Sequence, residues 1–162
     1  MGDHGTDRFC TSCGAALDGA LPHPRCTGCG RVQHRDPKVG VGVVVRDADG
    51  RLLLVRRAVH PEKGRWALPA GYVDHDEDPR LAAAREASEE TGLQVRVGEV
   101  VDVWPGTGDG GASFFLAFEA EVTGGDLRAG DDASEVGYFA ADALPDLAFA
   151  STRAVAQRVL DG

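Results

Sequence analysis

Apolar stretches alternate with short polar and glycine-rich segments along most of this chain. From residue 39 onward, β-branched and alternating apolar runs predict strands, and clusters of turn residues predict the loops between them. The turn signal DADG at 47–50 joins the first two runs and predicts a hairpin. The predicted strands are 39–46, 51–57, 93–104 (as one strand or two), 113–122 and 135–140, with a short extended piece at 66–71.

Two further segments are predicted to be helices because capping residues bracket them. Asp78 is a favourable N-cap, Pro79 suits the first helical position, and Gly92 favours a C-terminal stop. We therefore expect a helix over 79–91. A second helix is expected over 151–160, with Ser151 as its N-cap. These elements together predict an α+β fold built on a mixed sheet.

Composition and charge narrow the classes of function. At 162 residues the chain fits one ordinary domain with a small appendage. Its net charge of −9 argues against a nucleic-acid partner, because such a surface repels phosphate backbones. No apolar run approaches the roughly 20 residues of a membrane helix. The first ten residues lack the cationic start and apolar core of a secretory signal, so we expect a cytoplasmic protein.

The cysteines form two copies of one short pattern, FCTSCG and RCTGCG. Two such pairs can place four thiolates tetrahedrally around one Zn²⁺ ion. The candidate ligands are Cys10, Cys13, Cys26 and Cys29. Gly14 and Gly30 follow the second cysteine of each pair, where a tight turn requires positive φ. The repeated pattern predicts a zinc ribbon.

The alternatives are two disulfides or two redox pairs. A reducing compartment opposes disulfides, and the segment lacks the βαβ context of a redox CxxC. It is also too short for a hydrophobic core of its own, so metal binding would supply its folding energy. His34 lies nearby, and we expect it to be a surface residue. The expected organisation is a flexible leader at 1–7, a zinc ribbon at 8–34 and a larger domain at 35–162.

Three glutamates crowd the end of the first predicted helix. At about 100° per residue, Glu86, Glu89 and Glu90 fall within an arc of about 100° on one face. They lie near the negative end of the helix dipole and repel one another, and Arg85 relieves only part of this. A solvated acidic face is one interpretation. The other is that Mg²⁺ or Mn²⁺ is the missing partner, since hard cations bind carboxylate oxygens.

The spacing around these glutamates resembles the signature of the Nudix hydrolases, G-x5-E-x7-R-E-U-x-E-E-x-G-U, where U is apolar. The matching positions are Gly71, Glu77, Arg85, Glu86, Glu89, Glu90 and Gly92. The resemblance implies an α/β/α sandwich that hydrolyses a nucleoside diphosphate linked to another group. It implies that the three helix glutamates bind the metal ion, that Glu77 is a supporting acid, and that Arg85 orients a glutamate. Either Glu89 or Glu90 would serve as the base.

A narrower resemblance is to Nudix proteins with a zinc ribbon, which include the NADH and FAD pyrophosphatases. It rests on the two cysteine pairs, on RDPKVGVGVVV at 35–45 and on the tail EVGYFAADALPDLAFAS. It implies that Glu135, just before the Tyr-Phe pair of the tail, contacts metal. A solvated acid at a strand end is the alternative interpretation of Glu135. The acidic runs at 74–78 and 130–135 are also expected to be mostly solvated.

Substrate preference follows from one departure. The NADH-cleaving group carries SQPWPFPxS after the signature, and this chain has VDVWPGTGDGGASFF instead. The resemblance therefore favours FAD or ADP-ribose over NADH, with release of AMP. Trp104 is the best candidate for stacking on the base, and Tyr72 and Gly71 are further substrate contacts. The alternatives are a sanitiser of oxidised nucleotides such as 8-oxo-dGTP and a non-catalytic nucleotide-binding module. Dimers are common among proteins of this kind.

Overall fold

The computed structural model describes residues 8–19, 22–34, 36–108 and 111–160. Contacts within the chain divide it into two units: the first comprises the chain up to Pro37 together with 107–112, and the second comprises 38–106 and the chain from Ser113 onward. The predicted leader, residues 1–7, lies outside the described residues. The predicted division of the chain into leader, ribbon and larger domain stays a prediction. None of the helices in the described ranges is long and apolar enough to cross a bilayer.

The first unit is a small ribbon organised around two turns. Strand β1 (Leu17–Asp18) pairs antiparallel with β2 (Arg25–Cys26). Gly14 and Gly30 adopt φ values of 72° and 71°, as the cysteine pattern predicts. The Gly14 N–H donates to the Cys10 carbonyl at 2.9 Å, and the Gly30 N–H donates to the Cys26 carbonyl at 3.0 Å. The two CxxCG segments therefore fold as equivalent turns.

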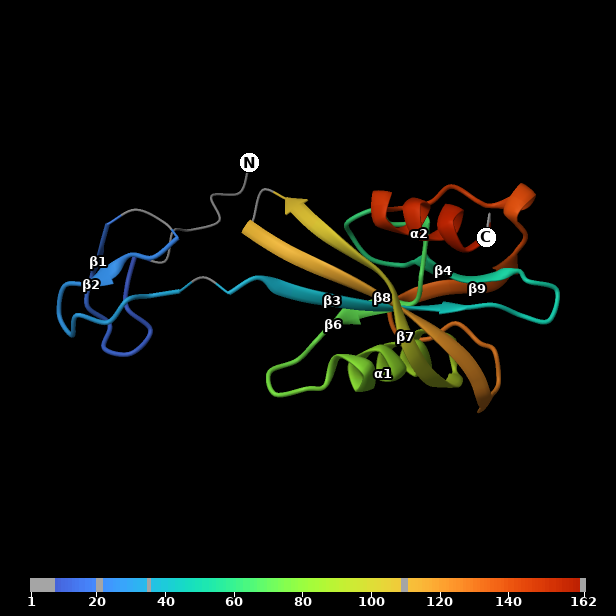
Figure 1. The fold of residues 1–162 in the computed structure, drawn as a ribbon, viewed down its shortest axis with the longest axis horizontal. Coiled ribbons are helices and arrows are strands. Elements are labelled where there is room, and N and C mark those ends of the chain that lie inside the picture. Colours follow the sequence, from blue (N-terminus) through green and yellow to red (C-terminus); the bar gives the residue numbers. More distant parts are fainter. Residues whose placement is uncertain (1–7, 20–21, 35, 109–110, 161–162) are drawn as a thin grey trace. The chain divides into compact units, whose positions relative to one another are not determined.

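The rest of the chain forms two sheets between helices. The strands are β3 (Lys38–Val45), β4 (Leu52–Arg57), β5 (Trp66–Ala67), β6 (Ala70–Tyr72), β7 (Leu93–Gly108), β8 (Gly111–Gly125) and β9 (Ala133–Phe139), and the helices are α1 (Pro79–Thr91), the 3₁₀-helix η1 (Ala141–Ala143) and α2 (Ala150–Leu160). One sheet has the order β6-β3-β8-β7 and the other β5-β4-β9. Because β3 runs parallel to β8 and antiparallel to β6, the larger sheet is mixed. Helices α1 and α2 pack against opposite faces of strands β3 and β4 (Figure 1), which confirms the predicted α/β/α sandwich.

The predicted hairpin of 39–46 and 51–57 is wrong. The turn itself forms, because the Asp47 N–H donates to the Arg51 carbonyl at 3.1 Å and Gly50 adopts a φ of 77°. Beyond an isolated bridge between Arg46 and Leu52, however, the strands separate. Strand β3 joins β6 and β8, whereas β4 joins β5 and β9. Each strand is apolar on both faces, so each is stabilised as the central strand of its own sheet.

Two hydrophobic cores follow from the alternation of side chains along these central strands. One core joins valines of β3 and Leu53 to the alanines of α1, and its central members are Val41, Val43, Val45, Leu53, Ala82, Ala83 and Ala87. The other joins the opposite faces of β3 and β4 to α2, through Val44, Leu52, Leu54, Leu68, Val155 and Ala156. Because the buried face of α1 consists mainly of alanines, its backbone can lie close to the larger sheet.

The helix boundaries agree with the capping prediction for α1 and differ for α2. Helix α1 spans the predicted 79–91. Helix α2 begins at Ala150, so Ser151 lies inside the first turn and is not the N-cap. The first turn closes on Phe149 instead, whose carbonyl accepts the Arg153 N–H at 3.1 Å. The prediction placed the N-cap at Ser151 because serine is a favourable N-cap residue, but Ser151 is already the second residue of the helix.

Candidate functional site

Helix α1 is fixed at both ends by the residues that predicted it. The Asp78 side chain accepts the Arg80 N–H at 2.8 Å, and Pro79 occupies the first helical position. Gly92 adopts the left-handed conformation with φ of 71°, and its N–H donates to the Ser88 carbonyl. These caps set the register of the helix, so the three glutamates and Arg85 take the positions that the signature requires.

The Arg85 guanidinium connects the helix to the loop before it. It binds both carboxylate oxygens of Glu77 at 2.9 Å, Glu86 at 2.8 Å and Glu89 at 3.2 Å. It also donates to the Tyr72 carbonyl of β6 at 3.2 Å. The Arg85 guanidinium, with help from the Asp74 N–H, lowers the pKa of Glu77 to about 2. Arg85 therefore holds Glu77 ionised and fixes the loop against the helix.

Glu90 is the buried member of the set. Its residue is 3% exposed, and its Oε2 accepts the Ala70 N–H at 2.8 Å. Burial, reinforced by the neighbouring carboxyl of Asp132, raises the pKa of Glu90 to about 9. Burial also raises the pKa of Glu86, although Arg85 opposes this. The chain alone thus supplies too little positive charge for this group of acids.

Asp132 is a site residue that the sequence did not reveal. The run 130–135 was expected to be mostly solvated, yet Asp132 lies beside Glu90 and lines the same cavity as Glu86. Its segment docks on the end of α1, since the Gly130 N–H donates to the Glu90 carbonyl at 3.1 Å. A side chain at position 130 would collide with the Glu89 carbonyl, so only glycine allows this approach.

Glu135 does not join these acids. It lies on β9 and forms an ion pair with Arg56 at 2.5 Å. It is absent from the lining of the cavity that holds Glu86 and Asp132. Its suggested contact with metal stays an untested prediction.

The carboxylates suit a hard divalent cation by their chemistry. They offer oxygen ligands on a rigid element, and one of them is buried without a cationic partner among the described residues. Arg85 binds Glu86 and Glu89, and within the described ranges the oxygens of these acids do not gather into one cluster. In the described part of the chain, the four cysteines form the group of potential ligands whose donor atoms lie within 4.8 Å of one another.

A cavity of about 720 Å³ lies beside the acids. The three predicted substrate contacts, Gly71, Tyr72 and Trp104, all line it. Its acidic lining consists of Asp74, Glu86, Asp131 and Asp132, and its aromatic lining also includes Phe114, Phe115 and Phe149. Tyr72 is 61% exposed, so its ring is accessible to a ligand. The cavity therefore places polar acids next to flat apolar surfaces.

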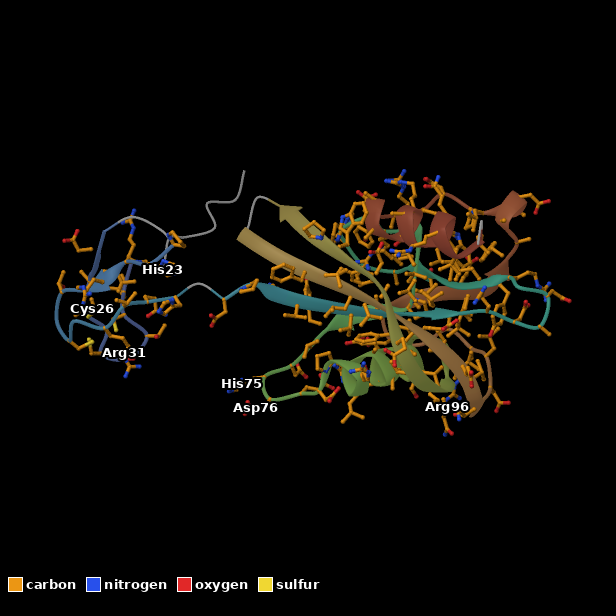
Figure 2. All side chains as sticks on the ribbon, viewed as in Figure 1. His23, Cys26, Arg31, His75, Asp76 and Arg96 are labelled. Atoms are coloured by element: carbon orange, nitrogen blue, oxygen red, sulfur yellow. The ribbon has the colours of Figure 1, made fainter. Side chains whose placement is uncertain are left out.

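The ribbon holds its four sulfurs at distances that suit a metal ion. The Cys10 and Cys29 sulfurs are 3.8 Å apart, and those of Cys13 and Cys26 are 3.4 Å apart. Four sulfurs around zinc would be separated by about 3.8 Å, whereas a disulfide requires about 2.05 Å. All four cysteines are free. Figure 2 shows yellow sulfur atoms gathered beside the labelled Cys26.

Backbone amides support thiolates in this cluster. The Cys29 and Gly28 N–H groups donate to the Cys26 sulfur at 3.3 and 3.4 Å. These bonds, that of Cys29 foremost, lower the pKa of Cys26 to about 6. His34 is exposed, as expected, and its ring packs edge-on against His23. The four cysteines can thus hold a structural zinc ion without a histidine.

Comparison with known proteins identifies relatives of the larger unit. A model of the NUDIX domain matches residues 36–159. An ADP-ribose pyrophosphatase of Methanocaldococcus jannaschii is 39% identical over 115 residues, which cover 70% of this chain and 68% of that protein. A MutT-like protein of Streptomyces ambofaciens is 39% identical over 105 residues, which cover 65% of this chain and 64% of that protein. The chain thus spans about two thirds of each relative.

Solved structures give the same result for the fold. A NUDIX hydrolase from Nitrosomonas europaea superposes with a TM-score of 0.83 at 28% identity, covering 95% of this chain and 90% of that one. A MutT NUDIX hydrolase from Burkholderia pseudomallei has a TM-score of 0.70 at 31% identity, covering 77% of this chain and 99% of that one.

The state of Glu90 predicts how stability depends on pH. Its pKa is raised from 4.5 to about 9 in the folded protein, so the folded state keeps a proton that the unfolded state loses. Glu90 should therefore lower the free energy of unfolding as pH rises from 4.5 to 9. In metal-free protein, Glu90→Gln should remove much of this decline, which is on the order of several kcal/mol. Chemical denaturation at pH 5 and pH 8.5 measures the difference.

The exposed Glu99 of β7 provides the control, since Glu99→Gln should leave the decline unchanged. Parallel pH profiles for the wild type and Glu90→Gln would contradict a buried, uncompensated carboxyl at position 90.

The ribbon geometry predicts metal content. The purified protein should contain about one zinc ion per chain, because four sulfurs complete a tetrahedral site. Cys26→Ser should lose this zinc, whereas Thr27→Ser, which keeps its hydroxyl bond to the Ala16 carbonyl, should retain it. Elemental analysis of dialysed protein measures both. Equal zinc content in the two variants, or none in the wild type, would rule out the four-cysteine site.

Proposed function

This chain belongs to the Nudix hydrolase family, and we propose that it cleaves the phosphoanhydride of a nucleoside diphosphate linked to a second group, such as ADP-ribose or FAD, with release of AMP. The observation that carries the proposal is a buried acid, Glu90, beside Glu86 and Asp132 at the edge of an aromatic-lined cavity. The acids of this site lack enough neighbouring positive charge to compensate them, and the cavity has room for a nucleotide.

We propose that Glu86, Glu89 and Glu90 hold Mg²⁺ or Mn²⁺, with Asp132 as a further carboxylate. A bound divalent cation would neutralise phosphate charge and make an attacking water more acidic. The acids of the chain are suited to holding such an ion because burial keeps two of them out of bulk water. Glu90 contributes a carboxylate whose position is fixed by the Ala70 N–H.

The side chains differ in their access to water, which suggests a division of roles. The Glu89 side chain is 46% exposed, whereas that of Glu86 is 13% exposed. Glu89 is therefore the acid best placed to accept a proton from water at its carboxylate. Arg85 positions this carboxylate, and Glu77 in turn positions Arg85 through two parallel hydrogen bonds. These roles are proposals for the residues that the signature singled out.

The cavity supports a dinucleotide-like substrate. Its volume of about 720 Å³ falls in the range of small-molecule sites. Tyr72 and Trp104 offer rings on which a base can stack. The relative from Methanocaldococcus jannaschii bears the name ADP-ribose pyrophosphatase, which favours ADP-ribose among the candidates. The net charge of −9 fits a small substrate bound through cations and does not favour a nucleic acid.

A substrate panel tests the proposed reaction. ADP-ribose, FAD, NADH and 8-oxo-dGTP would be incubated with Mg²⁺, with Mn²⁺ and without metal, and the products separated by chromatography. We expect metal-dependent release of AMP from ADP-ribose or FAD. Glu89→Gln should reduce kcat at least about a hundredfold, and Glu99→Gln should not. Selective cleavage of 8-oxo-dGTP would reassign the substrate, and no cleavage of any compound would contradict catalysis.

Gly71 predicts a loss of activity that is separate from stability. A Cβ at this position would overlap the Glu86 carboxylate, so Gly71→Ala should displace that carboxylate. The φ of Gly71 is not in the left-handed region, so the backbone itself tolerates alanine. We expect kcat/KM to fall about a hundredfold with little change in Tm.

Gly98→Ala on β7 is the matched control, because its Cβ would meet the nearest atom at an ordinary 3.4 Å. If Gly71→Ala kept wild-type kcat/KM, the position of the Glu86 carboxylate would have no part in the reaction.

A further inference from the structure

Arg57 is the cation of the cavity that no carboxylate neutralises in the described part of the chain. It ends strand β4 and lines the cavity together with Arg85, Glu86 and Asp132. Arg85 has its donors committed to Glu77, Glu86, Glu89 and the Tyr72 carbonyl. Arg57, in contrast, forms no ion pair with any acid among the described residues, although acids line the same cavity.

Two contacts hold the Arg57 side chain in place. Its Nε donates to the Pro61 carbonyl at 2.8 Å, and its guanidinium carbon lies 5.1 Å from the centre of the Phe149 ring. Stacking on an aromatic face restrains the plane of a guanidinium and leaves its edge accessible. The backbone is fixed as well, because the Arg57 N–H donates to the Arg65 carbonyl at 2.9 Å.

The two terminal nitrogens are therefore the ligand-binding edge of Arg57. They carry four N–H donors for which the described residues supply no acceptor. A planar pair of nitrogens matches two oxygens of a phosphate or carboxylate. The neighbouring acids repel any anionic ligand, so a ligand of Arg57 needs further oxygens that bind cations held by those acids. A diphosphate meets both requirements, because two of its oxygens can face Arg57 while others face the metal ions.

We propose that Arg57, stacked on Phe149, is a substrate-binding residue that takes two oxygens of the substrate's diphosphate. This inference rests on the proposed function, because it supplies the diphosphate with a contact other than the metal ions that the acids of α1 would hold. Arg57 acts in binding and has no proton to exchange, since a guanidinium remains charged at all ordinary pH values. It should therefore affect affinity more than the chemical step.

Direct binding tests this role without turnover. Calorimetry with Mg²⁺ would measure the affinity of the intact chain for inorganic pyrophosphate and for α,β-methylene-ADP, which resists hydrolysis at that bond. Arg57→Gln should weaken both ligands by about tenfold or more, and Arg57→Lys should weaken them less because it keeps the charge but loses the paired geometry. Arg96 is an exposed arginine of β7, labelled in Figure 2, and it provides the control. The variant Arg96→Gln should bind both ligands as the wild type does.

Kinetics provide the second measurement. If ADP-ribose is cleaved, Arg57→Gln should raise its KM by about tenfold or more and leave kcat within about threefold. Phe149→Leu should raise KM in the same direction, because it removes the stacking surface and keeps an apolar side chain. Circular dichroism confirms that each variant is folded, and Arg57→Lys and Phe149→Leu keep the test decisive if Arg57→Gln does not fold.

Two results would overturn the role of Arg57. One is binding of both ligands by Arg57→Gln within twofold of the wild type. The other is a loss confined to kcat. If the wild type bound both ligands through Arg57 yet hydrolysed no substrate, the proposed reaction would fail and the diphosphate contact would stand.

Discussion

The burial of the Glu90 carboxyl is the constraint on which the rest of the site depends. A carboxylate out of water is unfavourable unless a cation or several hydrogen bonds compensate it. Here one backbone N–H, that of Ala70, binds it, while Glu86 and Asp132 lie close enough to oppose its ionisation. Without a metal ion, the ionised carboxylate of Glu90 is therefore poorly compensated. A divalent cation would stabilise this ionised form strongly, because it would be the largest positive charge in the site.

The fold keeps that acid buried through a few close backbone approaches. The alanine face of α1 packs on β3, and β6 adds to the edge of the same sheet. Gly71 leaves space for the Glu86 carboxylate, and Gly130 lets the segment before β9 reach the end of the helix. The Arg85 guanidinium binds Glu86 and Glu89 as well as Glu77, so it already occupies oxygens of two of the helix glutamates. Cation binding at the helix would thus compete with Arg85 for the same oxygens.

Local rules predicted the parts of the site that are local in sequence. Caps at Asp78 and Gly92 fixed α1, and spacing alone placed Arg85 among the glutamates. The CxxCG repeat predicted both the positive φ of its glycines and the clustering of four sulfurs. These features depend on residues a few positions apart, for which geometry follows from helix period and turn chemistry.

The features that sequence reasoning missed depend on contacts between distant segments. A hairpin was expected for β3 and β4 because a turn joins them, yet burial on both faces assigns them to different sheets. Asp132 lies within an acidic run that looks solvated, and only docking on α1 brings it to Glu90. Arg57 adjoins Arg56 in sequence, but one lines the cavity and the other pairs with Glu135. Nothing local distinguishes them before the sheet order is known.

The central claim concerns a proton: we propose that Glu90 keeps its proton at neutral pH and releases it when a divalent cation binds. Calorimetric titration of Mg²⁺ or Mn²⁺ into metal-free protein at pH 7.5, repeated in buffers with different heats of ionisation, counts the protons released on binding. The account predicts release of about one proton per chain, lost when Glu90 is replaced by glutamine. Metal binding with no proton release, or with release unchanged in that variant, would contradict it.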